Sequence, residues 1–402
     1  MIYVLHSILL GSAIWLIGRK QPDQIIFYAG AFLKLAAGIA VGLIYRDHYY
    51  GGDTWNYYDS AKMLADLPFK EWWSQLGNAD IGAFPNQPRA ILFTKIVSGF
   101  IFITRGDYWI VASYFSFISF LAFWFFYRQI RSTLPNIKWP VVIGFLFFPS
   151  TVFWSAGILK GVITNASVVF ISGFSLKLFY RKKIHIPEII LSGLSIILLF
   201  YIKYYLLIVL FPVILYALFD KRAHRIGLTK PVRGIVYAVI LLITILVAPK
   251  INPNLRISDL PQVIHTNQLQ IQKANTSSSQ IDLLIDPTWS SLLTSAPKAL
   301  AIGLFGPTLF NAGSNWSWVP RLENLGIFLL AIFSLGLLLR QKLWEPDILV
   351  FAALAFILIL AVLLPLAAPN FGTLVRYRAP FTPFLVTLVT ILPCWIIQRR
   401  QE

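Results

Sequence analysis

The feature that most restricts the fold is a series of apolar runs, each long enough to cross the hydrocarbon core of a membrane. One of them reads IIFYAGAFLKLAAGIAVGLIY, and comparable runs recur along the 402 residues. A membrane-spanning helix needs roughly 17–25 apolar residues, and a soluble core could not absorb so many runs of this length. With 57% hydrophobic and 13% charged residues, the chain is expected to be an all-α, polytopic transmembrane helical bundle.

On the same length criterion we expect about eleven spans in a single transmembrane domain, residues 1–402. Their expected ranges are 2–18, 25–45, 108–127, 139–156, 162–180, 187–202, 204–219, 231–248, 323–340, 347–366 and 379–397. Arg19 and Lys20 follow the first run, whereas a secretory signal carries its charge before the run. The first run is therefore expected to remain as a span.

The distribution of Lys and Arg predicts the orientation, because cytoplasmic loops are enriched in these residues. With the N-terminus outside, six short inner pieces hold about half of the 34 Lys and Arg. These pieces are 19–24, 128–138, 181–186, 220–233, 340–346 and 398–402. Two long loops, 46–107 and 249–322, then lie on the outer face.

The run 89–104, RAILFTKIVSGFIFIT, resembles a span in composition. Counting it as one would place every later basic loop outside, so we expect an interfacial or re-entrant helix on the outer face. Lys34 lies in the middle of an expected span, where a charge is costly and needs a partner or a polar cavity.

The net charge of +17 is spread between the apolar runs and forms no single stripe, so no nucleic-acid partner is expected. Cys394 is the single cysteine, which excludes an intrachain disulfide and a cysteine metal site.

The stretch HYYGGDTWNYYDSAKML, residues 48–64, turns polar directly after a span. Together with FFPSTVFWSAGILKG, FYIKYYLL and NFGTLVRYRAPFTPF, in this order along the chain, it resembles the GT-C superfamily of membrane glycosyltransferases. The resemblance implies an enzyme of the bacterial cytoplasmic membrane, with its active site on the outer face. Such an enzyme moves a sugar from a polyprenyl phosphate or pyrophosphate carrier to a glycan, lipid or protein acceptor.

Transfer of this kind needs a base that takes a proton from the attacking hydroxyl, and cations that stabilise the leaving phosphate. Asp53 occupies the position of the family's first-loop acid and is the candidate base, although an Asp after two glycines also suits a helix N-cap. Asp59 is a second candidate.

Basic and aromatic residues near expected outer span ends are the candidates for phosphate and sugar binding. Arg is favoured for phosphate because its planar fork matches the oxygens, while the alternative is that these residues only reach lipid headgroups. The candidates are Arg89, Lys160, Lys203, Arg376, Tyr377, Arg378 and Trp316.

The chain departs from the family at GILKGV, where many members carry a second acid and this chain has Lys160 and Gly161. No cofactor is therefore expected, and a divalent metal is not indicated. This feature also resembles O-antigen or exopolysaccharide polymerases and ligases, which stay as the alternative. A transporter or flippase is the second alternative, although such proteins usually bind near the midplane between repeated halves.

Overall fold

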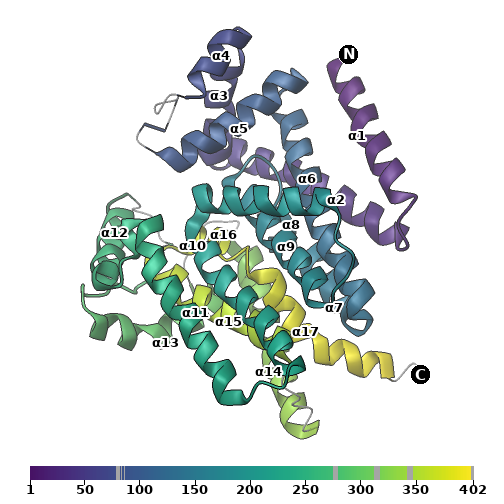
Figure 1. Cartoon of the computed structure of the whole chain (residues 1–402). Helices are drawn as coiled ribbons and strands as arrows, with labels where there is room; N and C mark the ends of the chain where they lie inside the picture. Colours follow the sequence, from purple (N-terminus) through teal and green to yellow (C-terminus); the bar gives the residue numbers. More distant parts are fainter. Residues whose placement is uncertain are drawn as a thin grey trace. The chain divides into compact units, whose positions relative to one another are not determined.

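The computed structural model describes residues 1–77, 82, 84–85, 87–274, 279–311, 317–341 and 347–399. These residues are helical almost throughout (Figure 1). The helices before residue 180 are α1 (Ile2–Gly18), α2 (Gln24–Asp47), α3 (Gly52–Ala65), α4 (Phe69–Gln75), α5 (Pro88–Thr104), α6 (Tyr108–Thr133), α7 (Lys138–Val141), α8 (Pro149–Phe153) and α9 (Lys160–Phe179). The later helices are α10 (Ile186–Arg225), α11 (Lys230–Ile251), α12 (Leu260–Ala274), α13 (Trp289–Phe305), α14 (Trp318–Gln341), α15 (Ile348–Ala367), α16 (Phe371–Tyr377) and α17 (Thr382–Arg399).

Seven helices in the described part of the chain are long and apolar enough to cross a membrane, which indicates a multi-pass membrane protein. They are α2, α6, α9, α10, the segment Pro231–Ile251 of α11, Trp318–Arg340 of α14, and α15. The helices Ile2–Gly18 and Thr382–Cys394 are apolar but shorter. The all-helical bundle is thus confirmed, whereas the count of eleven spans is not.

Two parts of the chain depart from the expected division into spans. The range 139–156 is divided among α7, a π-helical segment at Val142–Phe147, and α8, which begins at Pro149. Proline lacks an N–H group and starts a new helix there. The ranges 187–202 and 204–219 join in α10, whose backbone leaves helical geometry at Lys203 (φ −142°, ψ 66°).

Contacts between Cα atoms divide the chain into two compact units. Unit 1 contains Met1–Gln129, Leu146–Phe174 and His185–Tyr204, and unit 2 contains Ile130–Phe145, Ser175–Ile184 and Tyr205–Glu402.

The core of unit 1 forms where α3 and α5 pack against each other. Tyr57, Phe93 and Val97 are buried in this core. Residues of α2, α6 and the start of α9 belong to the same cluster. The run 89–104 is therefore a helix, as expected, and its buried face lies on the polar stretch that follows α2.

In unit 2, α13 packs against α15, and α14 against α17. A Cβ atom at Gly303 of α13 would collide with the backbone carbonyl of Ala361 in α15. Only glycine permits this approach, because any larger residue would push the two helices apart.

Basic pieces that were expected on the inner face meet at one end of unit 2. Lys182 Nζ donates to the backbone carbonyl of Ser132 (3.3 Å). Lys221 Nζ lies 3.8 Å and 4.1 Å from the ring centroids of Phe179 and Tyr180. The pieces 128–138, 181–186 and 220–233 are thus neighbours, as they must be if they share one membrane face.

Candidate functional site

The polar stretch after α2 folds as a tight turn followed by α3. Gly51 and Gly52 have positive φ angles of 105° and 51°, which glycine adopts without steric cost. The chain therefore reverses directly after the span, and α3 begins at Gly52. Asp53 lies in the first turn of α3.

This geometry corrects the N-cap interpretation of Asp53, because the residue before the helix is Gly51 and it has no side-chain cap. A carboxylate in the first turn still stabilises the helix through its dipole, by about 0.3–1 kcal/mol. Asp53 is half-buried, between buried neighbours on one side and solvent on the other.

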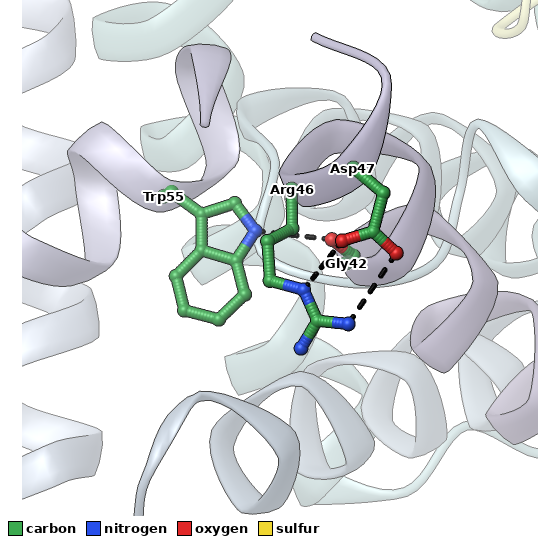
Figure 2. Close-up of polar contacts among 4 residues, drawn as sticks. All are labelled: Gly42, Arg46, Asp47 and Trp55. Atoms are coloured by element: carbon green, nitrogen blue, oxygen red, sulfur yellow. Dashed lines mark hydrogen bonds and ion pairs between the residues drawn. The ribbon is translucent and has the colours of Figure 1, made fainter. Parts of the chain in front are cut away.

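Trp55 fixes the start of α3 against α2 and α6. Its indole Nε1 donates to the backbone carbonyl of Gly42 (3.0 Å), as Figure 2 shows. Its ring stacks on Tyr108 with centroids 4.1 Å apart, and Thr54 Oγ1 shares a hydrogen bond of 2.7 Å with the Tyr108 hydroxyl. The orientation of the Asp53 backbone is therefore set by contacts of the two residues that follow it.

Figure 2 also shows Arg46 and Asp47, which end α2 beside this contact. Arg46 Nε lies 2.7 Å from Asp47 Oδ1, and both side chains are more than half exposed. Exposed pairs contribute little to stability, so this pair marks the polar end of α2 rather than a source of rigidity.

Lys160 contacts α3 at Tyr57. Its Nζ atom is 5.3 Å from the ring centroid of Tyr57, which follows Asp53 by four residues, about one helical turn. Tyr57 is held by rings on its other sides, at 4.6 Å from Phe84 and 4.9 Å from Phe93. One expected cation thus lies against α3, one turn after the expected base.

Lys160 is also the first residue of α9. A cation at a helix N-terminus opposes the helix dipole, whereas an anion there is favoured. The ammonium and the N-terminal N–H groups together make this end of α9 strongly positive, which suits a phosphate.

Asp59 lies two residues from Tyr57 and is exposed. Neighbours two apart point to different sides of a helix, so Asp59 does not share the face of Tyr57 and Lys160. Partial burial of the carboxyl raises the pKa of Asp59, and Lys62 opposes this effect.

Arg89 contacts the ring of Tyr204, the residue that follows Lys203. The guanidinium carbon of Arg89, at the start of α5, lies 4.6 Å from the Tyr204 ring centroid. Lys203 is the preceding residue, is buried, and occupies the non-helical position in α10. The expected cations of unit 1 are therefore positioned by α5, α9 and the break in α10.

In unit 2, the stretch PNFGT folds against the second long loop. Asn370 caps α16, since its side chain accepts from Thr373 N (3.1 Å). Its Nδ2 donates to Ser279 Oγ (3.0 Å), and Phe371 N donates to the Ser279 carbonyl (2.9 Å). The residues that lead into Arg376 are thereby fixed.

Arg376 and Arg378 have different environments although they are only two residues apart. Arg376 is half-buried, and its guanidinium carbon lies 5.6 Å from the Tyr377 ring centroid. Arg378 is 4% exposed and donates to the Gly306 carbonyl (2.5 Å) and to Asn324 Oδ1 (2.5 Å). Burial lowers the pKa of Arg378 to about 10, with Glu323 opposing the decrease, so the guanidinium stays charged at neutral pH.

Sequence reasoning missed Arg321, near the start of α14. Its Nε atom is buried and has no hydrogen-bond partner. Arg321 lies three residues before Asn324, and therefore on the same face of α14 as the partner of Arg378. The position of Arg321 near an expected outer span end could have identified it, because Arg376 was selected by the same criterion.

Trp316 lies outside the described residues. Within the described ranges, no group of three or more His, Cys, Asp or Glu is arranged to hold a metal ion. Comparison of the chain with protein-family models, with curated proteins and with solved structures finds no match. The likeness to the GT-C superfamily therefore rests on the sequence motifs.

Proposed function

We propose that the protein is a glycosyltransferase that moves a sugar from a polyprenyl-phosphate or pyrophosphate carrier to an acceptor on the outer face of a bacterial cytoplasmic membrane. The observation that supports the proposal is the contact of Lys160 with Tyr57, one helical turn after Asp53 in α3. A base and a cation are the two groups that this transfer requires.

In the proposed reaction, the Asp53 carboxylate accepts the proton of the acceptor hydroxyl. The hydroxyl oxygen forms a bond to the anomeric carbon as the bond from that carbon to the carrier phosphate breaks, so the configuration inverts. The leaving phosphate takes the electron pair, and Lys160 with the N-terminal end of α9 stabilises its charge. Arg89 and Lys203 add positive charge in the same unit.

In unit 2, Arg376 and Arg321 are proposed as phosphate-binding guanidinium groups of their own unit. Arg378 is assigned a structural role, because its guanidinium already donates to Gly306 and Asn324. The high share of basic residues, with Lys160 where many GT-C members have an acid, also suits a polymerase or ligase of lipid-linked glycans.

The test is the substitution Asp53→Asn, assayed for sugar transfer from a polyprenyl-linked donor in purified membranes. A general base contributes roughly 100-fold to 10,000-fold in turnover, whereas loss of the helix-dipole interaction costs only about 0.3–1 kcal/mol of stability. Asp66→Asn is the matched control, since Asp66 is exposed at the C-terminal end of the same helix. Its turnover should stay near that of the unmodified protein.

A near-normal rate in Asp53→Asn, at equal protein level, would remove Asp53 as the base. The polymerase or ligase alternative, in which Arg and Lys residues dominate, would then be preferred. Asp59→Asn separates the two carboxylates, and it is expected to have the milder effect because Asp59 faces away from Lys160.

A further inference from the structure

A cavity of about 330 Å³ lies within unit 2, between α10, α11 and α15. Its lining is apolar and aromatic: Val213, Tyr216, Tyr237, Phe351, Ala352 and Ala355. Ala352 and Ala355 are three residues apart and share one face of α15. Their small side chains leave the space that larger residues would fill.

An ion pair between α10 and α11 lies one helical turn from the two tyrosines of the cavity. Arg233 Nη1 lies 2.9 Å from Asp220 Oδ1, and the two side chains are only 18% and 14% exposed. Tyr216 precedes Asp220 by four residues, and Tyr237 follows Arg233 by four, so the ring contact between the tyrosines (4.4 Å) is the next layer of the same helix pair. Four residues rise about 6 Å along a helix, which places the cavity directly beyond the ion pair.

Asp220 does not occupy all the hydrogen-bond donors of the Arg233 guanidinium. The buried Nε atom of Arg233 has no hydrogen-bond partner. Nε and Nη2 form the lateral fork of a guanidinium, which matches two oxygens of a phosphate. Asp220 contacts Nη1 instead, and this leaves the lateral fork for another anion.

The surrounding charge is mainly basic, with Arg222, His224 and Arg225 in the last turn of α10. Both helices of the pair contain segments long and apolar enough to span a membrane. A ligand that suits this place must be amphiphilic, with a negative head at Arg233 and an apolar chain in the cavity. Tyr side chains are typical of the boundary between these two environments.

We propose that this cavity binds one anionic phospholipid. Its phosphate is held by the guanidinium of Arg233, and one acyl chain lies between Tyr216, Tyr237 and the two alanines of α15. The proposal does not depend on the glycosyltransferase assignment, because none of these residues belongs to the candidate site.

The experiment titrates the detergent-solubilised full chain with phosphatidylglycerol and counts bound lipid by native mass spectrometry. Ala355→Phe fills the cavity, and Arg233→Gln removes the charge at its polar end. Each change should weaken phosphatidylglycerol binding at least about tenfold. Arg233→Gln removes a charge-assisted contact, and in Ala355→Phe the added ring takes the space of the acyl chain. The controls are Ala238→Phe and Arg222→Gln, because both residues are exposed and neither lines the cavity.

Phosphatidylcholine and inorganic phosphate serve as two further probes. Phosphatidylcholine should bind more weakly than phosphatidylglycerol, and inorganic phosphate should not compete at equal concentration because it lacks the chain. Equal binding of both lipids, or unchanged phosphatidylglycerol binding in Ala355→Phe, would overturn the proposal. Equal loss in Arg222→Gln and Arg233→Gln would do so as well, since it would mean a diffuse basic surface.

Discussion

Replacement of Arg378 by Ala should lower the stability of the protein rather than its affinity for donor. The guanidinium is 4% exposed and donates two hydrogen bonds, to the Gly306 carbonyl and to Asn324 Oδ1. A hydrogen bond to a charged group contributes about 1.5–3 kcal/mol, and each buried acceptor left unsatisfied costs about 1–3 kcal/mol. We expect a loss of about 3–5 kcal/mol in the free energy of unfolding for Arg378→Ala.

Arg376→Ala is the matched comparison, because the same side chain is removed two residues away. Arg376 is half-buried and contacts the Tyr377 ring, an interaction of about 0.5–1 kcal/mol at an exposed site. Its loss should cost less stability than the loss of Arg378 and weaken donor binding roughly tenfold or more, if Arg376 binds phosphate.

The assay measures equilibrium unfolding in detergent for each variant, and donor binding on the folded protein. A double-mutant cycle with Asn324→Ala isolates the contact between Arg378 and Asn324, and a coupling free energy above about 1 kcal/mol is expected. Arg378→Ala protein of normal stability that has lost donor binding would refute this reasoning. It would make Arg378 the phosphate contact.

Three further predictions concern packing and topology. Gly303→Ala should destabilise the protein by about 1–3 kcal/mol, because a Cβ atom there collides with the backbone of α15. Ser155→Ala removes the acceptor of the buried Lys34 ammonium and should cost about 1.5–3 kcal/mol. With Cys394 replaced, a cysteine at Ser74 should react with an impermeant reagent in intact cells, and one at Ser132 should not.

Each of these predictions has a control within the chain. Gly326 has open space at its Cβ position, so Gly326→Ala should be neutral or stabilising. Ser172 bonds only within its own helix turn, to the Val168 carbonyl, and Ser172→Ala should change stability by less than about 0.5 kcal/mol. Equal effects of the paired glycine or serine substitutions would contradict the packing argument, and labelling at Ser132 would invert the predicted topology.

The spans could be predicted where apolar length alone decides the structure. α2 is an apolar run between Asp23 and Arg46, and α15 is an apolar run that follows Asp347; their observed ends lie within a few residues of the expected ones. The range 139–156 has the same composition but is interrupted, because Pro140 and Pro149 remove backbone donors. The mean composition of a segment does not reveal such an interruption, because it does not register where a backbone donor is missing.

The candidate site could be predicted by residue type but not by environment. The sequence presents Arg376 and Arg378 as equivalent cations, and their difference arises from Gly306 and Asn324, which are 72 and 54 residues away from Arg378. Arg321 was missed for the same reason, since its buried Nε is visible only once α14 has packed. Long-range packing, which no local sequence pattern contains, decides how deeply each guanidinium group is buried.

Lys34 shows what the sequence and the structure each contribute. Its position in a span predicted a partner, and the structure supplies Ser155, 121 residues away, which accepts from Nζ and in turn donates to the Thr151 carbonyl. The ammonium also lies 4.2 Å from the Phe123 ring centroid. A transporter would be expected to hold such a charge for its substrate at the midplane, whereas here a hydroxyl and an aromatic ring already hold it. Lys34 therefore has a structural explanation, whereas Asp53 and Lys160, each in the first turn of a helix, keep the roles proposed for them.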